Sequence, residues 1–453
     1  MEGDFQLIIL DDDPTGIQTV HGCLLVTCWQ RGTLRRAFQD SCRFFYILTN
    51  TRAESAERTE AIIAEAVENV LEVNREFGYS LVFISRSDST LRSHFPLEIE
   101  TIRRAVETAA GREVEAIFLA PAFFEGGRVT ADDTHYLVTP EGRLPTSSTE
   151  FARDSVFGYS TSYLPDYIQE KTGGRVAAGE VLSVPLTMLR REGKELEGFL
   201  SVLMGGDYVV VNAESYADLD RFSAAVRAQV GKGRLFLFQS AASMVKSLAQ
   251  VPDKPLLDRT AVLGDKASQG QDRGLFVIGS HVGRSTSQLR RLLEEPAVRG
   301  IEIEVRELLK EPQAVMVLAK AEIRAALATS RSPVLYTSRQ ELTFPSREMR
   351  LEAGRKISFF LASLVRELEY KPSFLVAKGG ITSHDILVRG LGVEAVRVLG
   401  QLLPGVPVVE VPDGKGRGMP YVIFPGNVGE EDALLRLYRL LRAPPDGRLA
   451  LGS

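Results

Sequence analysis

The segment LIILDDDPTG, residues 7–16, joins a short apolar run to a cluster of three aspartates. An apolar run of four residues that ends in a polar turn is typical of a buried strand. Similar runs recur along the first half of the chain, and the stretches between them carry apolar residues at helical spacing. These runs cover residues 44–48, 81–84, 116–119, 208–212 and 235–238, and the helical stretches cover residues 55–77, 96–110 and a region from about 215. The alternation predicts a doubly wound α/β domain.

A polar, irregular stretch at about residues 251–273 interrupts this pattern. It contains prolines, glycines and charged residues, which are typical of a boundary between domains. After it the alternation restarts, with strand-like runs at residues 275–278, 301–305, 334–337, 374–377, 408–411 and 421–424. The fold class we expect is therefore α/β. We predict two doubly wound α/β domains, residues 1–255 and 270–453, with an active-site cleft between them.

The composition restricts the class of protein. Of 453 residues, 44% are hydrophobic and 25% are charged, as in an ordinary globular protein. The 54 basic and 59 acidic residues give a formal charge of -5, so no basic excess attracts nucleic acid or an anionic membrane. No apolar run approaches the ~18–20 residues of a membrane span. The three cysteines, Cys23, Cys28 and Cys42, form no zinc-ligand pattern, and we expect packed thiols in a cytoplasmic protein.

The aspartate cluster at residues 11–13 follows the first expected strand. In an open parallel sheet, ligands bind outside the carboxyl ends of the strands. Three neighbouring carboxylates repel one another unless a cation or a donor-rich ligand answers them. A turn in which one aspartate caps the next helix would account for one of the three. The cluster therefore predicts a general base for a hydroxyl group, or hydrogen bonds to a polyol.

Two further polar segments follow strands in the first half. Residues 85–94, SRSDSTLRSH, combine two arginines, which suit a carboxylate, with groups that suit sugar hydroxyls. The alternative is a solvated loop that caps the helix after Pro96. Residues 125–136 resemble a binding loop, in which His135 either orients a substrate or is an ordinary hydrogen-bonded histidine.

The second half has three strand-to-helix junctions rich in small residues, at residues 277–287, 374–385 and 424–429. Small residues let backbone N–H groups approach an anion at a helix start, although glycine also serves plain turns. Three such loops in one domain predict a nucleotide with several phosphates. There is no G-x-x-x-x-G-K-[ST] motif, and no G-x-G-x-x-G opens a helix after a strand, which counts against a Walker-type enzyme and a dinucleotide dehydrogenase.

Together these segments resemble the four-carbon acid sugar kinase family. The matching motifs are DDPTG at residues 12–16, DSTLR at 88–92, GR with HY at 127–128 and 135–136, GS at 279–280, KGGITS at 378–383 and GN at 426–427. The sequence departs from the family pattern at PGNVGE, residues 425–430, and at TADDT, residues 130–134. The resemblance implies a sugar-acid domain followed by a nucleotide domain.

On this basis we expect an ATP-dependent kinase that phosphorylates a hydroxyl of a small, four-carbon sugar acid, with Mg²⁺ offsetting the phosphate charge. A nonenzymatic sensor that binds the sugar acid and nucleotide is the alternative. The expected partners are these small molecules, with no nucleic acid and no membrane. A homo-oligomer is left open, and no metal ligands are assigned. The candidate catalytic residues are Asp12, Asp13 and Asp88; the substrate-binding ones are Thr15, Arg86, Ser89, Thr90, Arg92, Arg128 and His135; the nucleotide-binding ones are Ser280, Lys378, Gly379, Gly380, Ile381, Thr382, Gly426 and Asn427.

Overall fold

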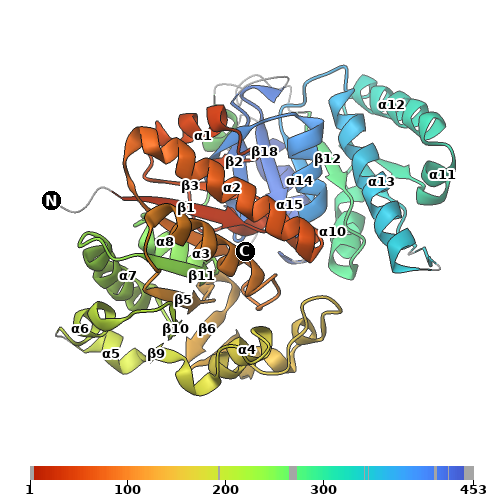
Figure 1. Ribbon diagram of the computed structural model, residues 1–453. Helices are drawn as coiled ribbons and strands as arrows, with labels where there is room; N and C mark the ends of the chain where they lie inside the picture. Colours follow the sequence, from red (N-terminus) through yellow and green to blue (C-terminus); the bar gives the residue numbers. More distant parts are fainter. Residues whose placement is uncertain are drawn as a thin grey trace. The chain divides into compact units, whose positions relative to one another are not determined.

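The structure is a computed structural model that divides the chain into two compact units, Met1–Asp253 and Lys254–Ser453 (Figure 1). It describes residues 5–191, 194–264, 273–340, 342–344, 346–412, 416–426 and 428–442. Both units are α/β, which confirms the predicted fold class.

The first unit is built on a parallel sheet. Its strands are β1 (Phe5–Asp11), β2 (Leu24–Val26), β3 (Phe44–Leu48), β4 (Ser80–Arg86), β5 (Ala116–Ala120), β9 (Leu182–Val184), β10 (Asp207–Val211) and β11 (Phe236–Ser240). They lie in the order β2-β3-β1-β4-β11-β5-β10-β9, and every neighbouring pair is parallel. In β1 the six residues after Phe5 are all buried, as expected for a strand covered on both faces of a parallel sheet.

Helices follow most strands of this unit. They are α1 (Arg31–Phe38), α2 (Ala56–Phe77), α3 (Leu97–Ala110), α4 (Leu164–Lys171), α5 (Leu186–Arg190), α6 (Glu195–Val202), α7 (Tyr216–Val230) and α8 (Ala242–Leu248). The long helix α2 begins after Ser55, whose side chain accepts the N–H of Arg58, and ends at Gly78 in the left-handed conformation (φ 70°). Its apolar stripe is buried, and α2 packs against α3, as Figure 1 shows.

A small antiparallel sheet stands where the sequence suggested a binding loop at residues 125–136. Its strands are β6 (Arg128–Ala131), β7 (Thr134–Thr139) and β8 (Gly142–Pro145). Asp132 and Asp133 form the two-residue connection between β6 and β7, with φ values of 48° and 57°. Positive φ at both positions is what a type I′ hairpin turn requires, and aspartate tolerates it better than most residues. The two extra charges in TADDT therefore belong to a hairpin turn.

The second unit contains a mixed sheet. Its strands are β12 (Leu275–Ile278), β13 (Val298–Ile303), β14 (Ser332–Thr337), β15 (Leu375–Lys378), β16 (Ala395–Leu403), β17 (Val406–Glu410) and β18 (Pro420–Phe424), in the order β13-β14-β12-β15-β18-β17-β16. The neighbours among β13, β14, β12, β15 and β18 pair in parallel. Strand β17 is antiparallel to both β18 and β16. The strand β16 was not predicted from the sequence. The turn between β16 and β17 is too short for a crossover, so these two strands must run antiparallel.

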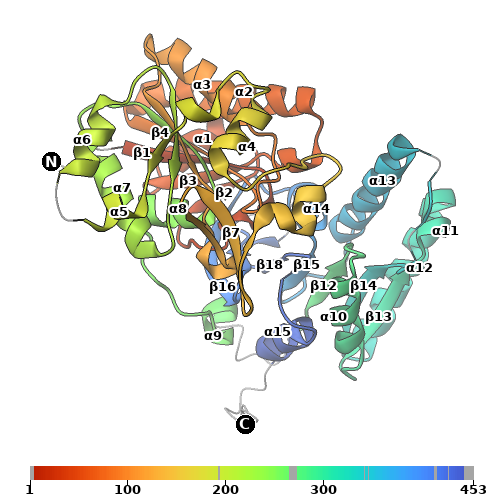
Figure 2. The same ribbon diagram turned by 90° about the horizontal axis from the view of Figure 1, so that it is seen from below.

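Helices cover the parallel part of this sheet. They are α9 (Arg259–Leu263), α10 (Gly283–Leu293), α11 (Val305–Lys310), α12 (Pro312–Ala328), α13 (Arg347–Arg366), α14 (Gly380–Asp385) and α15 (Ala433–Arg442). Helix α12 lies beside β13 and β14 (Figure 2). The core of the unit joins Phe276 and Phe374 from the strands or their ends with Leu434 and Tyr438 from α15. Within the described residues, no helix combines the length and apolar character needed to cross a membrane.

Candidate functional site

In the first unit, the carboxyl ends of three adjacent strands bring the predicted polar segments together. Asp11 at the end of β1 is in register with Leu48 of β3 and with Arg86 of β4. The loops that follow these strands carry Asp12, Asp13 and Asp88. The sequence argument that polar residues gather at this edge rested on strand ends alone, and the parallel register supplies its physical basis.

Two arginines, Arg52 and Arg86, pair with the aspartate cluster. Arg86 is buried, and its Nη1 lies 3.1 Å from Asp11 Oδ1 and 3.7 Å from Asp12 Oδ1. Arg52 grips Asp12 with two nitrogens, Nε at 3.0 Å from Oδ2 and Nη2 at 2.5 Å from Oδ1. Asp12 is only 2% exposed, so this paired contact accounts for both of its oxygens. The two arginines therefore offset part of the repulsion between the carboxylates.

Asp13 is the most open of the three aspartates. Its side chain is 18% exposed, and its Oδ1 accepts hydrogen bonds from the backbone N–H (2.8 Å) and the hydroxyl (2.5 Å) of Thr15. Its Oδ2 faces Arg52 Nη1 at 3.3 Å. Burial would raise the pKa of Asp13, but Arg52 and the Thr15 hydrogen bonds outweigh it and lower the pKa. Asp13 thus forms the expected helix cap, and the hydroxyl of Thr15 donates its hydrogen bond to the capping oxygen.

Asp11 is the opposite case. It is fully buried, and burial, with the charges of Asp12 and Asp13, raises its pKa to about 7 despite the opposing effect of Arg86. Its Oδ2 has no hydrogen-bond partner among the described residues. A Cβ at Gly16 would lie 2.0 Å from this oxygen, so only glycine fits there. Asp11 therefore packs against Gly16 in the turn, and its Oδ1 accepts the N–H of Asp13 at 3.4 Å.

The segment after β4 folds around Asp88. Its Oδ2 accepts hydrogen bonds from Arg92 Nε at 2.7 Å and from the Thr90 hydroxyl. Burial would raise the pKa of Asp88, but Arg52 and Arg92 outweigh it and hold the pKa well below its ordinary value. The Arg92 guanidinium lies 4.8 Å from the centre of the Phe151 ring. Its side chain is 25% exposed, which leaves it accessible to a ligand.

His135 has no exposed surface. Its Nδ1 lies 2.9 Å from Thr130 Oγ1 and its Nε2 lies 2.8 Å from the carbonyl oxygen of Ser89. Burial lowers its pKa to about 4, so the ring is neutral near pH 7. This geometry favours the hydrogen-bonded histidine over a direct contact with substrate. Arg128 contacts the carbonyl of Gly126 and is electrostatically coupled to Asp88.

Arg52 was not predicted from the sequence. It forms ion pairs with Asp12 and Asp13, and its charge lowers the pKa of Asp88. The available signal was its position, four residues after the strand that ends at Leu48. Glu98 on α3 was also missed. It is buried and accepts hydrogen bonds from the hydroxyls of Thr51 (2.5 Å) and Ser85 (3.0 Å), and burial raises its pKa to about 7. It anchors the residue that precedes Arg52.

In the second unit, the three glycine-containing loops meet because β12, β15 and β18 are neighbours. The N–H of Gly379 donates to the carbonyl of Phe424 (2.9 Å). The hydroxyl of Ser285 lies 3.0 Å from both Ser280 Oγ and the carbonyl oxygen of Gly426. The structure thus brings together the predicted nucleotide-binding residues that it describes, whereas Asn427 lies outside the described residues.

Glycine is favoured at two of these positions, by the backbone conformation at Gly379 and by a tight contact at Gly426. Gly379 has φ 109°, and a Cβ there would lie 3.1 Å from the Cβ of Ser280. A Cβ at Gly426 would lie 3.2 Å from Ser280 Oγ. Larger residues would push the loops apart. Beside them, Ile381 is 57% exposed, whereas Thr382 is buried.

Lys378 has no exposed surface. Its Nζ donates to the carbonyl oxygens of Pro425 (2.9 Å) and Gly426 (3.4 Å) and lies 4.2 Å from the centre of the Phe424 ring. Burial, with the neighbouring charge of Arg284, lowers its pKa to about 7. Lys378 therefore contacts the loop that follows β18 through its carbonyl oxygens.

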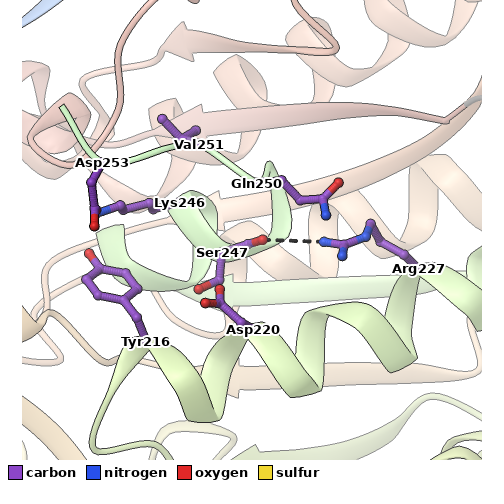
Figure 3. A pocket seen from close by; sticks show the side chains of 8 residues that line it. All are labelled: Tyr216, Asp220, Arg227, Lys246, Ser247, Gln250, Val251 and Asp253. Atoms are coloured by element: carbon purple, nitrogen blue, oxygen red, sulfur yellow. Dashed lines mark hydrogen bonds and ion pairs between the residues drawn. The ribbon is translucent and has the colours of Figure 1, made fainter.

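A separate pocket of about 440 Å³ lies between α7 and α8 of the first unit (Figure 3). There Lys246 pairs with Asp253 at 2.6 Å and lies over the Tyr216 ring. None of the residues predicted from the sequence lines this pocket, so we do not assign the site to it. Among the described residues, no group of three or more histidine, cysteine or acidic side chains could hold a metal ion.

Comparison with known proteins finds a known domain in each half of the chain. A model of a sugar-binding N-terminal domain matches residues 7–248, and a model of a nucleotide-binding C-terminal domain matches residues 275–434. The chain belongs to the four-carbon acid sugar kinase family. Within this family, it is 24% identical over 407 residues to a D-threonate kinase of Bordetella bronchiseptica, which covers 87% of this chain and 85% of the relative.

Two solved structures share the family fold at 16% identity. A Haemophilus influenzae protein has a TM-score of 0.63 and covers 96% of this chain and 100% of its own. A Salmonella typhimurium LT2 protein has a TM-score of 0.70 and covers 96% of this chain and 98% of its own. At this identity the likeness concerns the fold.

Proposed function

We propose that the protein is an ATP-dependent kinase that phosphorylates a hydroxyl of a small sugar acid with four carbons. The first unit would bind the sugar acid and the second unit would bind ATP. The proposal rests on the charged edge of the first unit, which consists of Asp12, Asp13, Arg52, Asp88 and Arg92. This edge lies within the part matched by the sugar-binding family model. The D-threonate kinase relative supports a four-carbon acid, and the nucleotide-binding family model supports ATP.

The charged edge offers a place for each part of such a substrate. Arg92 is partly exposed and stacked on Phe151, so it can present its remaining N–H groups to the substrate carboxylate. Arg86 is less suited, because it is buried against Asp11. The carboxylates of Asp13 and Asp88 remain open to sugar hydroxyls.

Asp13 is the base that we favour. Phosphoryl transfer proceeds largely by positioning and charge stabilisation, so its base must mainly orient the attacking hydroxyl and accept a proton late. Asp13 has an accessible oxygen whose one contact, with Arg52, is loose at 3.3 Å. Both oxygens of Asp12 are held by Arg52, and Asp12 is buried. We therefore assign Asp12 to holding Arg52, and keep Asp88 as the second candidate base.

The described residues do not by themselves make a Mg²⁺ site. The acidic side chains near Asp12 are already paired with arginines. Turnover measured with and without Mg²⁺ tests whether the ion is required. Magnesium in kinases is commonly held in large part by the substrate phosphates.

The test is ADP release from ATP with a panel of four-carbon sugar acids and the matching polyols, with and without Mg²⁺. We expect turnover with at least one acid and much less with its polyol. Binding of acid and ATP without ADP release would identify a sensor protein instead. The panel also determines which stereoisomer is the substrate.

A further inference from the structure

Arg339, just beyond the end of β14, holds the Ser280 loop from behind. Its Nη1 donates to the carbonyl oxygen of Ser280 at 2.7 Å, and its Nε donates to the carbonyl oxygen of Thr337 at 2.8 Å. Its Nη2 lies 2.8 Å from Thr337 Oγ1 and 3.5 Å from the carbonyl oxygen of Ile278. One guanidinium thus connects the ends of β12 and β14 at the start of the loop.

Lys378 does the same for the Gly426 loop, through the carbonyl oxygens of Pro425 and Gly426. Neither Lys378 nor Arg339 forms an ion pair with any described residue. Lys378 is fully buried, which is costly for a cation without a carboxylate, and the loop carbonyls supply only partial compensation. Arg339 is only half-buried. The charged groups coupled to them are Arg284, which faces Lys378, and Glu302, which acts on Arg339 from β13. Lys378 is therefore only partly protonated near pH 7, since its pKa lies at about 7, whereas Arg339 keeps its positive charge beside the Ser280 loop.

The direction of the carbonyls determines the direction of the N–H groups. Within one planar trans peptide, C=O and N–H point to opposite sides. The carbonyls of Ser280 and Pro425 point back to the two cations, so the N–H groups of His281 and Gly426 point the other way. No described residue accepts a hydrogen bond from either N–H group. Backbone donors with positive charge behind them suit an anion.

We infer that Arg339 and Lys378 are positioning residues of the nucleotide site, which hold the Ser280 and Gly426 loops by their carbonyl oxygens so that the N–H groups of His281 and Gly426 face the phosphates. This inference rests on the proposed function, because it takes ATP as the ligand. It differs from the sequence-based prediction for Lys378, in which the lysine itself binds the nucleotide. It also adds Arg339, which lies in none of the predicted motifs.

The test compares Arg339→Met and Lys378→Met with Arg331→Met in the full-length protein. Arg331 is a matched control because it is exposed and lies at the opposite end of β14. The dissociation constants of ATP and adenosine are measured by calorimetry, and the KM values of ATP and the sugar acid by ADP release. We expect at least tenfold weaker ATP binding in the two variants, with adenosine binding and the KM of the acid changed less than twofold. Arg331→Met should match the wild type.

Rescue separates positioning from general support of the fold. Arg339→Lys should recover part of the ATP affinity, because one ammonium can reach the Ser280 carbonyl but cannot also hold Thr337. Wild-type ATP affinity in Arg339→Met, or equal losses for ATP and adenosine, would overturn the inference. If Lys378→Met is unstable, the Arg339 variants decide the matter alone. Failure of the proposed function shows differently, since the wild-type protein would then bind no ATP or would bind ATP and the acid without releasing ADP.

Discussion

Replacing Arg52 with methionine tests the central ion-pair arrangement of the first unit. The substitution keeps the length of the stem and removes the charge that both oxygens of Asp12 contact at 2.5 and 3.0 Å. Asp12 is 2% exposed and Arg52 24% exposed, so the pair is largely shielded from water. Removing one partner of a buried pair costs about 3–5 kcal/mol, and the partial exposure of Arg52 places the expected loss near ~3 kcal/mol.

The loss should depend on pH. Burial, opposed mainly by Arg52, raises the pKa of Asp12 above its ordinary value, and removing Arg52 raises it further. A buried carboxyl with a raised pKa favours the folded state at low pH, and this contribution is lost as the pH rises through the folded-state pKa. The difference between Arg52→Met and the wild type should therefore be larger at pH 8 than at pH 5.

The assay is urea unfolding followed by the fluorescence of Trp29, the single tryptophan of the chain, which lies in the first unit. The matched control is Arg35→Met, which removes an arginine that grips Glu76 with two nitrogens at the surface. We expect no measurable change in the control. If Arg52→Met is no less stable than Arg35→Met at pH 8, the cluster does not depend on Arg52, and the assignment of Asp12 to holding it is wrong.

Three further predictions concern the same unit. Asp13→Asn keeps an oxygen that can accept the hydrogen bonds of Thr15 and removes the charge, so kcat should fall by roughly 10²–10⁴ with little change in the KM of the acid; steady-state kinetics with a Mg²⁺ titration checks this, and near-wild-type turnover would transfer the role of base to Asp88. Arg92→Met should lose ~2 kcal/mol of binding to the acid, the lower end of the range for a charge pair because Arg92 is partly exposed; the ratio of kcat/KM for acid over polyol measures it, and an unchanged ratio would exclude Arg92 as the carboxylate contact. Glu98, whose pKa burial raises to about 7 from 4.5, should make the wild type lose up to about 3 kcal/mol of unfolding free energy as the pH rises from 4.5 through 7; unfolding of Glu98→Gln should show a flatter profile over this window, and parallel profiles would contradict the raised pKa.

Several features of the fold and the site could be predicted from local sequence. Apolar runs followed by polar or glycine-containing segments located β1, β4, β12, β15 and β18 and the loops at their ends. The hairpin turn at Asp132 and Asp133 could not be recognised, because aspartates in a loop serve turns and ligands equally well. The role of His135 was equally open, since the contact of its buried ring with the carbonyl oxygen of Ser89 joins residues 46 positions apart in the chain.

The sequence by itself determined which residues stand at the ends of strands, because a strand and the loop after it are continuous in the chain. Only the tertiary structure decided which of these loops meet and which charges pair. Arg52 reaches Asp12 across 40 positions of the chain, and Arg339 reaches Ser280 across 59. Such pairings depend on the order of strands in the sheet, and that order follows from the burial of apolar faces by the whole domain. Arginines that form surface ion pairs, such as Arg35, cannot be distinguished from Arg52 or Arg339 by the sequence around them.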